Sequence, residues 1–198
     1  MSIQSLDTKL LLLINHGAVS SFFDILMPAL SQRGYLLIIP FLLAMLLRGA
    51  RHENNMRKTL LTPAIWTLAV SVCALFFAEV AEYIVKETTA RLRPCQVIEG
   101  LRLIVPCPPS YSMPSGHAIS SFAFALPLFS LTQEYIALIW RLYPLLLASL
   151  IAFSRIYLGV HYPSDVLVGA LLGASIGQAL SSLHQLMETE EIVKRNNR

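Results

Sequence analysis

The sequence predicts an all-α protein, a polytopic bundle of transmembrane helices in a single membrane-embedded domain covering residues 1–198. Two features of the composition support this. Hydrophobic residues make up 55% of the chain and charged residues only 14%, whereas a soluble domain carries about 25% charged residues. The mean hydropathy is +0.60. A third observation is that the apolar residues form long runs, which indicate membrane spans rather than a soluble core.

Five of these runs predict firm spans. Several are shorter than the ~20 residues of a full span, so their polar ends should lie in the interface or inside the bundle. We expect the helical bundle to occupy residues 33–185. The five runs are Tyr35–Leu47, Leu60–Val85, His117–Leu131, Tyr135–Ile156 and Val166–Leu183.

The N-terminal segment, residues 1–32, has a different pattern. Leu10–Ile14 is apolar but brief, and Phe22–Leu30 carries Asp24 and Pro28. We expect two short helices that lie in the membrane interface with their apolar faces toward the lipid. The alternative is one poorly patterned span, which would make six. A cleaved signal peptide is not expected, because the basic start and the small-residue cleavage site are missing.

The distribution of basic residues predicts the orientation. One group lies between the first two spans and another in the tail, residues 186–198. Five spans place both groups on the same side, which should be cytoplasmic by the positive-inside rule. The opposite surface then collects the end of the second span, the start of the third, the end of the fourth and the start of the fifth. The basic residues are Arg48, Arg51, Arg57, Lys58, Lys194, Arg195 and Arg198.

Three segments near that non-cytoplasmic surface carry charges that a membrane penalises. They are KETTARLRP (residues 86–94), PSGH (114–117) and SRIYLGVHYPSD (154–165). Charged groups near apolar spans cost at least a few kcal/mol each, so they are functional candidates. Three cations, two imidazoles and one carboxylate suit a phosphate-ester hydrolase that needs no metal. These residues are Lys86, Arg93, His117, Arg155, His161 and Asp165.

Neither a metal cofactor nor a nucleic-acid partner is expected. The chain has no carboxylate cluster suited to Mg²⁺. Its formal charge of +3 is small, and its basic residues are not interleaved with aromatic ones. The expected partners are the lipid bilayer and a membrane substrate.

The PSGH segment predicts the start of a helix that can bind an anion. Backbone N–H groups at a helix start point outward, and the helix dipole favours negative charge there. Gly116 lets the backbone approach a ligand closely, and the Ser115 hydroxyl can donate a hydrogen bond. The alternatives are a plain helix start after Pro114 and a structural role for His117.

The third segment places a histidine and a carboxylate four residues apart at the start of the fifth span. This spacing lets Asp165 reach the imidazole of His161 and orient it, as in the orienting arm of a catalytic triad. The alternative for Asp165 is a simple helix cap next to Pro163. Arg155 has a rigid fork of donors that suits phosphate oxygens.

The first segment adds Lys86 and Arg93 at the end of the second span. The alternative is that these side chains only snorkel toward the membrane surface. Glu82 shares a helix face with Lys86 and could neutralise it. Arg91 either assists the site or meets lipid headgroups.

These three motifs resemble those of the type 2 phosphatidic acid phosphatase superfamily, which also includes vanadium haloperoxidases and glucose-6-phosphatase. The family pattern Lys, six residues, Arg-Pro matches Lys86–Pro94. Pro-Ser-Gly-His matches Pro114–His117, and Ser-Arg, five residues, His, three residues, Asp matches Ser154–Asp165. All three agree without substitution. Integral members usually have six spans, so the difference from five concerns residues 1–32.

The resemblance implies a mechanism and roles for individual residues. His161 attacks phosphorus to form a phosphohistidine, Asp165 orients it, and His117 protonates the leaving oxygen. Water then hydrolyses the intermediate without a metal. The phosphoryl oxygens would be held by Lys86, Arg93, Ser115, the Gly116 N–H and Arg155.

The resemblance also implies a substrate class and a location. We expect a lipid phosphatase of bacterial inner-membrane type whose site faces the periplasm. Undecaprenyl diphosphate is the favoured substrate, followed by the lipid A 1-phosphate, with phosphatidic acid and phosphatidylglycerol phosphate as further alternatives. A vanadate-dependent peroxidase shares the motifs but is soluble. A non-enzymatic scaffold or transporter would explain the spans but not the set of charges.

Two further patterns concern packing and the loop between the first two motifs. Gly169, Gly173 and Gly177 recur every four residues and should let a neighbouring helix approach closely, with a dimer interface as the alternative. Cys95 and Cys107 flank eleven residues of a loop placed outside the cytoplasm, so we expect a disulfide. The alternative there is two unrelated thiols. Cys73, in the second span, should stay a free thiol.

Overall fold

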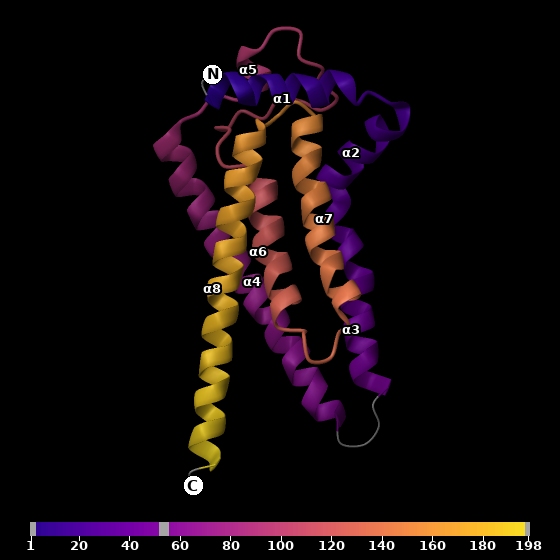
Figure 1. Ribbon diagram of the computed structural model, residues 1–198, viewed down its shortest axis with the longest axis vertical. Coiled ribbons are helices and arrows are strands. Elements are labelled where there is room, and N and C mark those ends of the chain that lie inside the picture. Colours follow the sequence, from indigo (N-terminus) through magenta and orange to yellow (C-terminus); the bar gives the residue numbers. More distant parts are fainter. Residues whose placement is uncertain (1–2, 52–55, 197–198) are drawn as a thin grey trace.

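The computed structural model describes residues 3–51 and 56–196, with the side chains of residues 4–45 and 63–194. Every regular element in these ranges is helical, which confirms the all-α prediction (Figure 1). The elements are α1 (Ile3–Gly17), α2 (Ser21–Arg33), the short 3₁₀ helix η1 (Gly34–Ile38), α3 (Ile39–Arg51), α4 (Met56–Thr89), α5 (Pro94–Val97), α6 (Gly116–Ser130), α7 (Leu138–Tyr157) and α8 (Pro163–Asn196).

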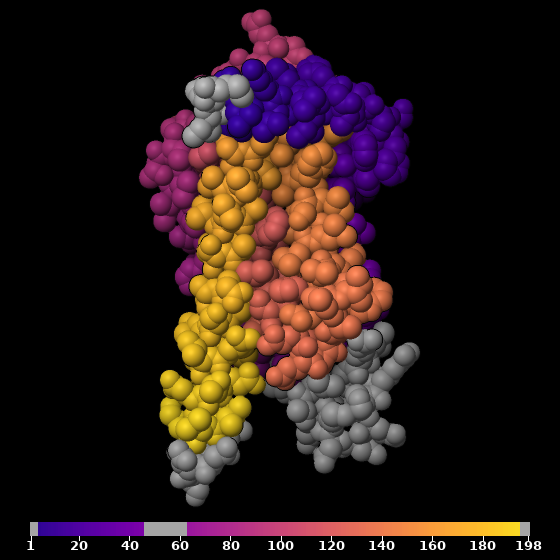
Figure 2. Space-filling model, viewed as in Figure 1, coloured from indigo at the N-terminus to yellow at the C-terminus, as the bar shows by residue number. Residues whose placement is uncertain are grey.

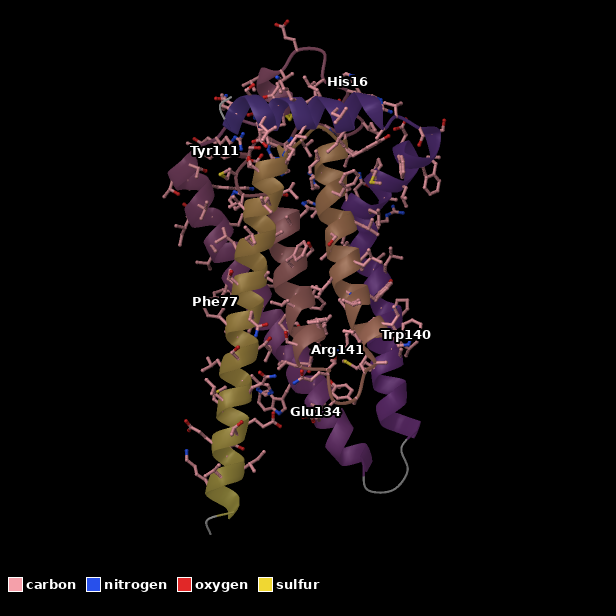
Figure 3. The ribbon with its side chains drawn as sticks, in the orientation of Figure 1. His16, Phe77, Tyr111, Glu134, Trp140 and Arg141 are labelled. Atoms are coloured by element: carbon pink, nitrogen blue, oxygen red, sulfur yellow. A yellow bond between two sulfur atoms is a disulfide. The ribbon has the colours of Figure 1, made fainter. Side chains whose placement is uncertain are left out.

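Four helical stretches are long and apolar enough to cross a membrane. They are Ser21–Met45, Pro63–Val97, Leu138–Tyr157 and Pro163–Lys194, and α6 is a shorter apolar helix among them. Large apolar side chains cover the outside of the bundle, including Phe77 and Trp140, which are 50% and 59% exposed and project from its flanks (Figure 3). A contiguous apolar exterior of this kind marks contact with lipid.

The N-terminal segment differs from the expectation in one respect. Phe22–Leu30 does not form a separate interfacial helix, because α2 continues through η1 into α3 and the whole stretch Ser21–Met45 is one candidate span. The Asp24 carboxylate inside it is neutralised by Arg102 and accepts a hydrogen bond from the Tyr157 hydroxyl at 2.5 Å. Placing an acidic residue with such partners in an apolar segment costs less free energy than placing an isolated carboxylate there.

Helix α1 lies across one end of the bundle, over the ends of α7 and α8 (Figures 1 and 2). Asn15 anchors it, since its fully buried side chain donates to the carbonyls of Arg102 and Tyr157, both at 2.9 Å. Leu6 and Leu13, by contrast, are 47% and 67% exposed. The interfacial position of α1 stays a prediction, which this exposed apolar surface favours.

The opposite end of the bundle carries the end of α3, the start of α4 and the end of α8 (Figure 1). Within the segment predicted as a cytoplasmic tail, residues 186–196 are helical and continue α8 as far as Asn196. Lys194 there pairs with Glu190 at 3.5 Å. The remaining basic residues used to predict orientation, Arg48, Arg51, Arg57, Lys58, Arg195 and Arg198, have side chains outside the described ones.

Helix α6 forms the centre of the bundle, between α4, α7 and α8. The glycine stripe of α8 packs directly against it, as the sequence predicted. A Cβ atom on Gly177 would lie 2.8 Å from the Ala123 carbonyl oxygen, and one on Gly173 would overlap the Ile119 carbonyl. The stripe therefore lies inside the bundle and brings the backbones of α6 and α8 into contact.

The loop between α5 and α6 closes the same end of the bundle as α1. Cys95 and Cys107 form a disulfide there, with their Cα atoms 5.9 Å apart. Cys73 is a free thiol on the exposed side of α4. The bridge ties the segment after Arg93 to the segment that approaches Pro114.

We predict that Gly173→Leu destabilises the protein and lowers its activity together, because the added side chain forces α6 and α8 apart. Overpacking of this kind costs typically 1–3 kcal/mol. Thermal unfolding in detergent would measure it, with Ser175→Leu on the exposed face of α8 as the control of equal bulk. A change in oligomer size alone would instead identify the stripe as a dimer interface.

Candidate active site

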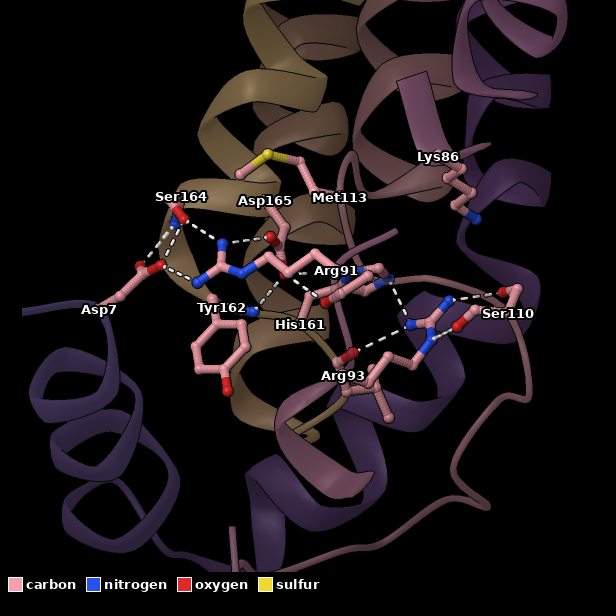
Figure 4. Close-up of polar contacts among 12 residues, drawn as sticks. Asp7, Lys86, Arg91, Arg93, Ser110, Met113, His161, Tyr162, Ser164 and Asp165 are labelled. Atoms are coloured by element: carbon pink, nitrogen blue, oxygen red, sulfur yellow. Dashed lines mark hydrogen bonds and ion pairs between the residues drawn. The ribbon is translucent and has the colours of Figure 1, made fainter. Parts of the chain in front are cut away.

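The three motifs meet at the end of the bundle that α1 covers. Ala90, with a left-handed φ of 45°, follows the end of α4 and turns the chain toward Arg93. Gly159, with φ of 73°, follows the end of α7 and leads to His161. Only glycine adopts this conformation readily. A Cβ atom on Gly159 would also lie 3.1 Å from the Leu101 side chain. Backbone turns thus bring the two segments together (Figure 4).

His161 lies between Arg93 and Asp165. Its Nε2 is 2.8 Å from Nη1 of Arg93, and its Nδ1 is 3.6 Å from Oδ2 of Asp165. A guanidinium can only donate, so Nε2 must be the accepting nitrogen and a neutral ring carries its proton on Nδ1, facing the carboxylate. This tautomer places the lone pair of the ring on Nε2, the nitrogen that would attack if His161 acted as a nucleophile.

Burial keeps the His161 imidazole neutral. The side chain is 2% exposed. Desolvation is the main cause that lowers the pKa of His161, to about 4, and the nearby Arg93 charge lowers it further, although the Asp165 carboxylate opposes both. An unprotonated imidazole at neutral pH is the form required for nucleophilic attack.

The Asp165 carboxylate is fully buried and accepts several hydrogen bonds. Its Oδ2 accepts from the Ser112 hydroxyl at 2.5 Å and from the Tyr162 N–H at 2.8 Å. Its Oδ1 accepts from Nη1 of Arg91 at 2.6 Å. Asp165 lies in the first turn of α8 rather than at its N-cap, and its bond from the Tyr162 N–H caps the start of that helix. The structure therefore combines capping and orientation in one carboxylate.

Arg93 is 3% exposed and held by the loop before α6. Its guanidinium donates to the Ser110 carbonyl and hydroxyl at 2.7 and 2.9 Å, and to the Val160 carbonyl at 2.9 Å. A side chain that only snorkelled would end at the surface. The described contacts instead fix its charge next to His161.

The second motif joins the third through the backbone. The Ser115 N–H donates to the main-chain oxygen of Asp165 at 3.0 Å. Ser115 precedes the first residue of α6, but its hydroxyl makes no capping hydrogen bond, so it is available to a ligand. Nε2 of His117, the second residue of α6, is 3.1 Å from the carbonyl oxygen of Ser31. Because a carbonyl only accepts, the proton of His117 lies on Nε2.

Arg155 also reaches Ser31, a residue of α2. Its Nη1 donates to the Ser31 hydroxyl, while its Nε has no partner. Nothing in the sequence indicates that α2 contributes to the site, because Ser31 belongs to no motif. Its contribution follows from α2 being part of a span rather than lying in the interface.

Lys86 is paired with Glu82 at 2.6 Å, as the i, i+4 spacing allowed. The Glu82 carboxylate also lies against Gly116, so that a Cβ atom on Gly116 would overlap it. The glycine therefore leaves space for a carboxylate at the start of α6. An anionic ligand at that helix start would compete with Glu82 for Lys86.

Unsatisfied polar atoms concentrate in this region. Among the described side chains, four buried nitrogen or oxygen atoms lack a hydrogen-bond partner, and three of them belong to predicted site residues: Ser115 Oγ, Arg155 Nε and His161 Nδ1. His161 Nδ1 faces the Asp165 carboxylate at 3.6 Å. Buried polar groups are normally satisfied, so the other two atoms, Ser115 Oγ and Arg155 Nε, point to a ligand.

An apolar cavity of about 660 Å³ adjoins the site. Its volume is within the ~300–1,000 Å³ typical of ligand pockets. Its polar lining residues are Ser31, Gln32, Glu79, Glu82, His117, Ser120 and Ser121, and Gly116 lies beside them. The apolar wall comes from α2, η1, α4, α6 and α7 and includes Leu30, Ile38, Leu75, Phe124, Leu147 and Ile151.

Several residues at the site were not identified from the sequence. The sequence leaves Arg91 open between assisting the site and meeting lipid headgroups, and no motif includes Asp7 or Ser112. The position of Arg91 two residues before Arg93, in a charged segment, is the one local signal for it. Asp7 is separated from Arg91 by 84 positions, so no local pattern links them.

Comparisons with known proteins agree with this geometry. The model of the PAP2 superfamily matches residues 64–187. A protein of Sulfolobus acidocaldarius named undecaprenyl-diphosphatase is 38% identical over 111 residues, which cover 56% of this chain and 50% of that protein. The chain thus spans half the length of this relative.

Two other similarities extend over more of the chain. A protein of Bacteroides thetaiotaomicron named lipid A 4'-phosphatase is 28% identical over 185 residues, covering 86% of this chain and 73% of that protein. The crystal structure of Aquifex aeolicus LpxE superposes with a TM-score of 0.67 at 28% identity, covering 91% of this chain and 98% of the other.

We predict that His161 remains the neutral Nδ1–H tautomer at pH 6, where an ordinary histidine, with a pKa of about 6.5, is mostly protonated. Its pKa is depressed, so its contribution to stability is present above pH 6.5 and is lost as the pH falls toward 4. The ¹⁵N chemical shifts of the ring would report both tautomer and pKa. Arg93→Gln should raise this pKa; titration of the wild-type ring near 6.5 would contradict the assignment.

We also predict that Glu82→Gln strengthens the binding of inorganic phosphate, because it frees the charge of Lys86. Removing one competing charge at this distance should raise affinity roughly tenfold. Titration calorimetry would measure this directly. Glu79→Gln is the matched control, since the Glu79 carboxylate accepts from Ser120 at 3.0 Å. Unchanged or weaker binding in Glu82→Gln would show that Glu82 does not compete with the anion.

Proposed function

The chain belongs to the PAP2 superfamily, and we propose that it is a metal-independent phosphatase that hydrolyses a lipid phosphate or diphosphate in the membrane. The observation that carries this proposal is the set of unsatisfied atoms beside His161: the Ser115 hydroxyl and the Arg155 Nε are buried donors awaiting an acceptor. A phosphoryl group has the oxygens to satisfy them.

The proposed reaction proceeds in two displacements. The Nε2 lone pair of His161 attacks phosphorus, the bond to the leaving oxygen breaks, and His117 supplies the proton which that oxygen takes up. Water then attacks the phosphohistidine, which releases inorganic phosphate and restores the imidazole. In the first step the guanidinium of Arg93 transfers its hydrogen bond from Nε2 to a phosphoryl oxygen. The negative charge of Asp165 stabilises the ring as positive charge develops on it.

The phosphoryl oxygens would be held by groups from all three motifs. Lys86, Arg93 and Arg155 supply positive charge, and the Ser115 hydroxyl and the Gly116 N–H supply hydrogen bonds at the start of α6. Charge stabilisation at preorganised donors is usually the largest contribution to catalysis of phosphoryl transfer.

A lipid substrate is supported by the cavity beside the site. Its apolar wall suits a hydrocarbon chain, and its polar part begins at His117 and Gly116. We favour undecaprenyl diphosphate, in line with the name of the Sulfolobus relative. A lipid A phosphate, such as the 1-phosphate, is the second candidate, because the similarity to the Bacteroides protein and to LpxE extends over most of the chain.

We place the site at the non-cytoplasmic face of a bacterial inner membrane. The Cys95–Cys107 disulfide supports this orientation, because it lies at the site end of the bundle and such bonds persist in oxidising compartments. The basic residues at the opposite end agree with the positive-inside rule.

Phosphate release by detergent-solubilised protein in EDTA tests the proposal. We expect His161→Ala to abolish hydrolysis and phosphoenzyme formation, and Asp165→Asn to lower kcat by roughly 10²–10⁴-fold while the protein stays folded. His117→Ala should impair substrates with poor leaving groups more than an aryl phosphate. Near-normal turnover of purified His161→Ala would refute the mechanism.

A lipid panel in the same assay identifies the substrate. We expect undecaprenyl diphosphate to give the highest kcat/KM, above lipid A, phosphatidylglycerol phosphate and phosphatidic acid. Preference for lipid A would favour the second candidate. Failure to hydrolyse any member, with a folded protein, would favour the non-enzymatic alternative.

A further inference from the structure

A pair of charged residues outside the three motifs connects α1 to the carboxylate that orients His161. The guanidinium of Arg91 lies between two carboxylates, those of Asp165 in α8 and Asp7 in α1 (Figure 4). The mechanism above uses neither Arg91 nor Asp7.

Arg91 makes full use of its forked geometry. Its Nη1 donates to Oδ1 of Asp165 at 2.6 Å and to the Ser164 hydroxyl at 2.7 Å. Its Nη2 donates to Oδ2 of Asp7 at 2.7 Å. The guanidinium also lies over the ring of Tyr162, 4.1 Å from its centroid. Such stacking and bidentate donation require arginine rather than lysine.

Asp7 is equally well held, although it lies in a helix that covers the end of the bundle. Its side chain is 4% exposed. Besides the bond from Arg91, its carboxylate accepts from the Ser164 N–H at 2.9 Å and from the Ser164 hydroxyl. Ser164 is in the first turn of α8, one residue before Asp165. Asp7 therefore fastens α1 to the turn that carries Asp165.

These contacts act on the oxygen of Asp165 that does not face His161. Oδ2 faces the imidazole, and Oδ1 is held by Arg91. Without Arg91, Oδ1 would lose its charged partner in a fully buried position. The carboxylate would then be held through Oδ2 alone, by the Ser112 hydroxyl and the Tyr162 N–H, and it could tilt about that oxygen relative to Nδ1 of His161. Truncating one partner of a buried ion pair leaves an uncompensated charge.

We propose that Arg91 and Asp7 are positioning residues for the reaction at His161: Arg91 fixes the Asp165 carboxylate, and Asp7 fixes Arg91 by docking α1. Turnover would thus depend on α1 being seated on the bundle. This inference rests on the proposed phosphatase function, since it concerns the same nucleophile.

Steady-state kinetics of full-length variants in detergent test the proposal. Arg91→Gln should lower kcat roughly 10–100-fold with KM changed less than about threefold, because the phosphate-binding groups remain in place. Arg91→Lys should recover part of this loss. Asp7→Asn should lower kcat by roughly 3–10-fold, and it should have little further effect in the Arg91→Gln background, because both act through Asp165.

Asp24→Asn provides the matched control. Asp24 also pairs an N-terminal helix with an arginine, Arg102, and accepts from Tyr157, but it does not contact Asp165. Its kcat should stay within about twofold of wild type. An equal loss of kcat in Asp24→Asn would overturn the proposal, since general docking of the N-terminal helices would then explain the effect.

The remaining outcomes separate this inference from the proposed function. If wild type hydrolyses lipid phosphate and Arg91→Gln has wild-type kcat, the inference is wrong and the function stands. If wild type hydrolyses none of the panel, the function fails and the inference fails with it. If Arg91→Gln does not fold, as judged by thermal unfolding, Asp7→Asn decides, because it leaves the Arg91–Asp165 pair intact. Additive losses in the double variant would also overturn the coupling.

Discussion

The buried carboxylate of Asp165 is the interaction on which the site depends. Its side chain joins Arg91, Ser112 and the Tyr162 N–H, and its main-chain oxygen accepts from Ser115. One residue thereby ties the end of α4, the loop before α6, the start of α6 and the start of α8 to a common point. A buried charge without partners costs much free energy. The need to keep this carboxylate paired therefore constrains the positions of its partners, and the partners in turn hold Asp165 in place.

This meeting point requires α6 and α8 to approach closely over their length. The glycines of α8 remove the side chains that would hold the helices apart, and Gly169 faces the Ser115 carbonyl itself. Without a hydrophobic force between helices in lipid, such backbone packing carries much of the association. The small-residue stripe therefore determines how near the second motif lies to the third.

The charges of the site are balanced within an apolar bundle. Lys86 is matched by Glu82, Arg91 by Asp7 and Asp165, and Arg155 bonds to Ser31. Arg93 is held by backbone and hydroxyl oxygens. Such pairing lowers the cost of keeping cations near a membrane. It also suggests why a phosphoryl group could bind without large rearrangement: it would replace Glu82 and Nε2 of His161 as acceptors.

Hydropathy and spacing along the chain are local properties, so they are enough to predict the all-α membrane bundle and to identify the motif residues, which are Lys86, Arg93, Ser115, Gly116, His117, Arg155, His161 and Asp165. Only the folded structure shows that α2 continues into the candidate span Ser21–Met45, that Ser31 contacts Arg155, and that Asp7 holds Arg91. The physical reason is distance along the chain. Asp24 is compensated by Arg102, 78 positions away, and no window of neighbouring residues contains the partner that makes a buried charge acceptable.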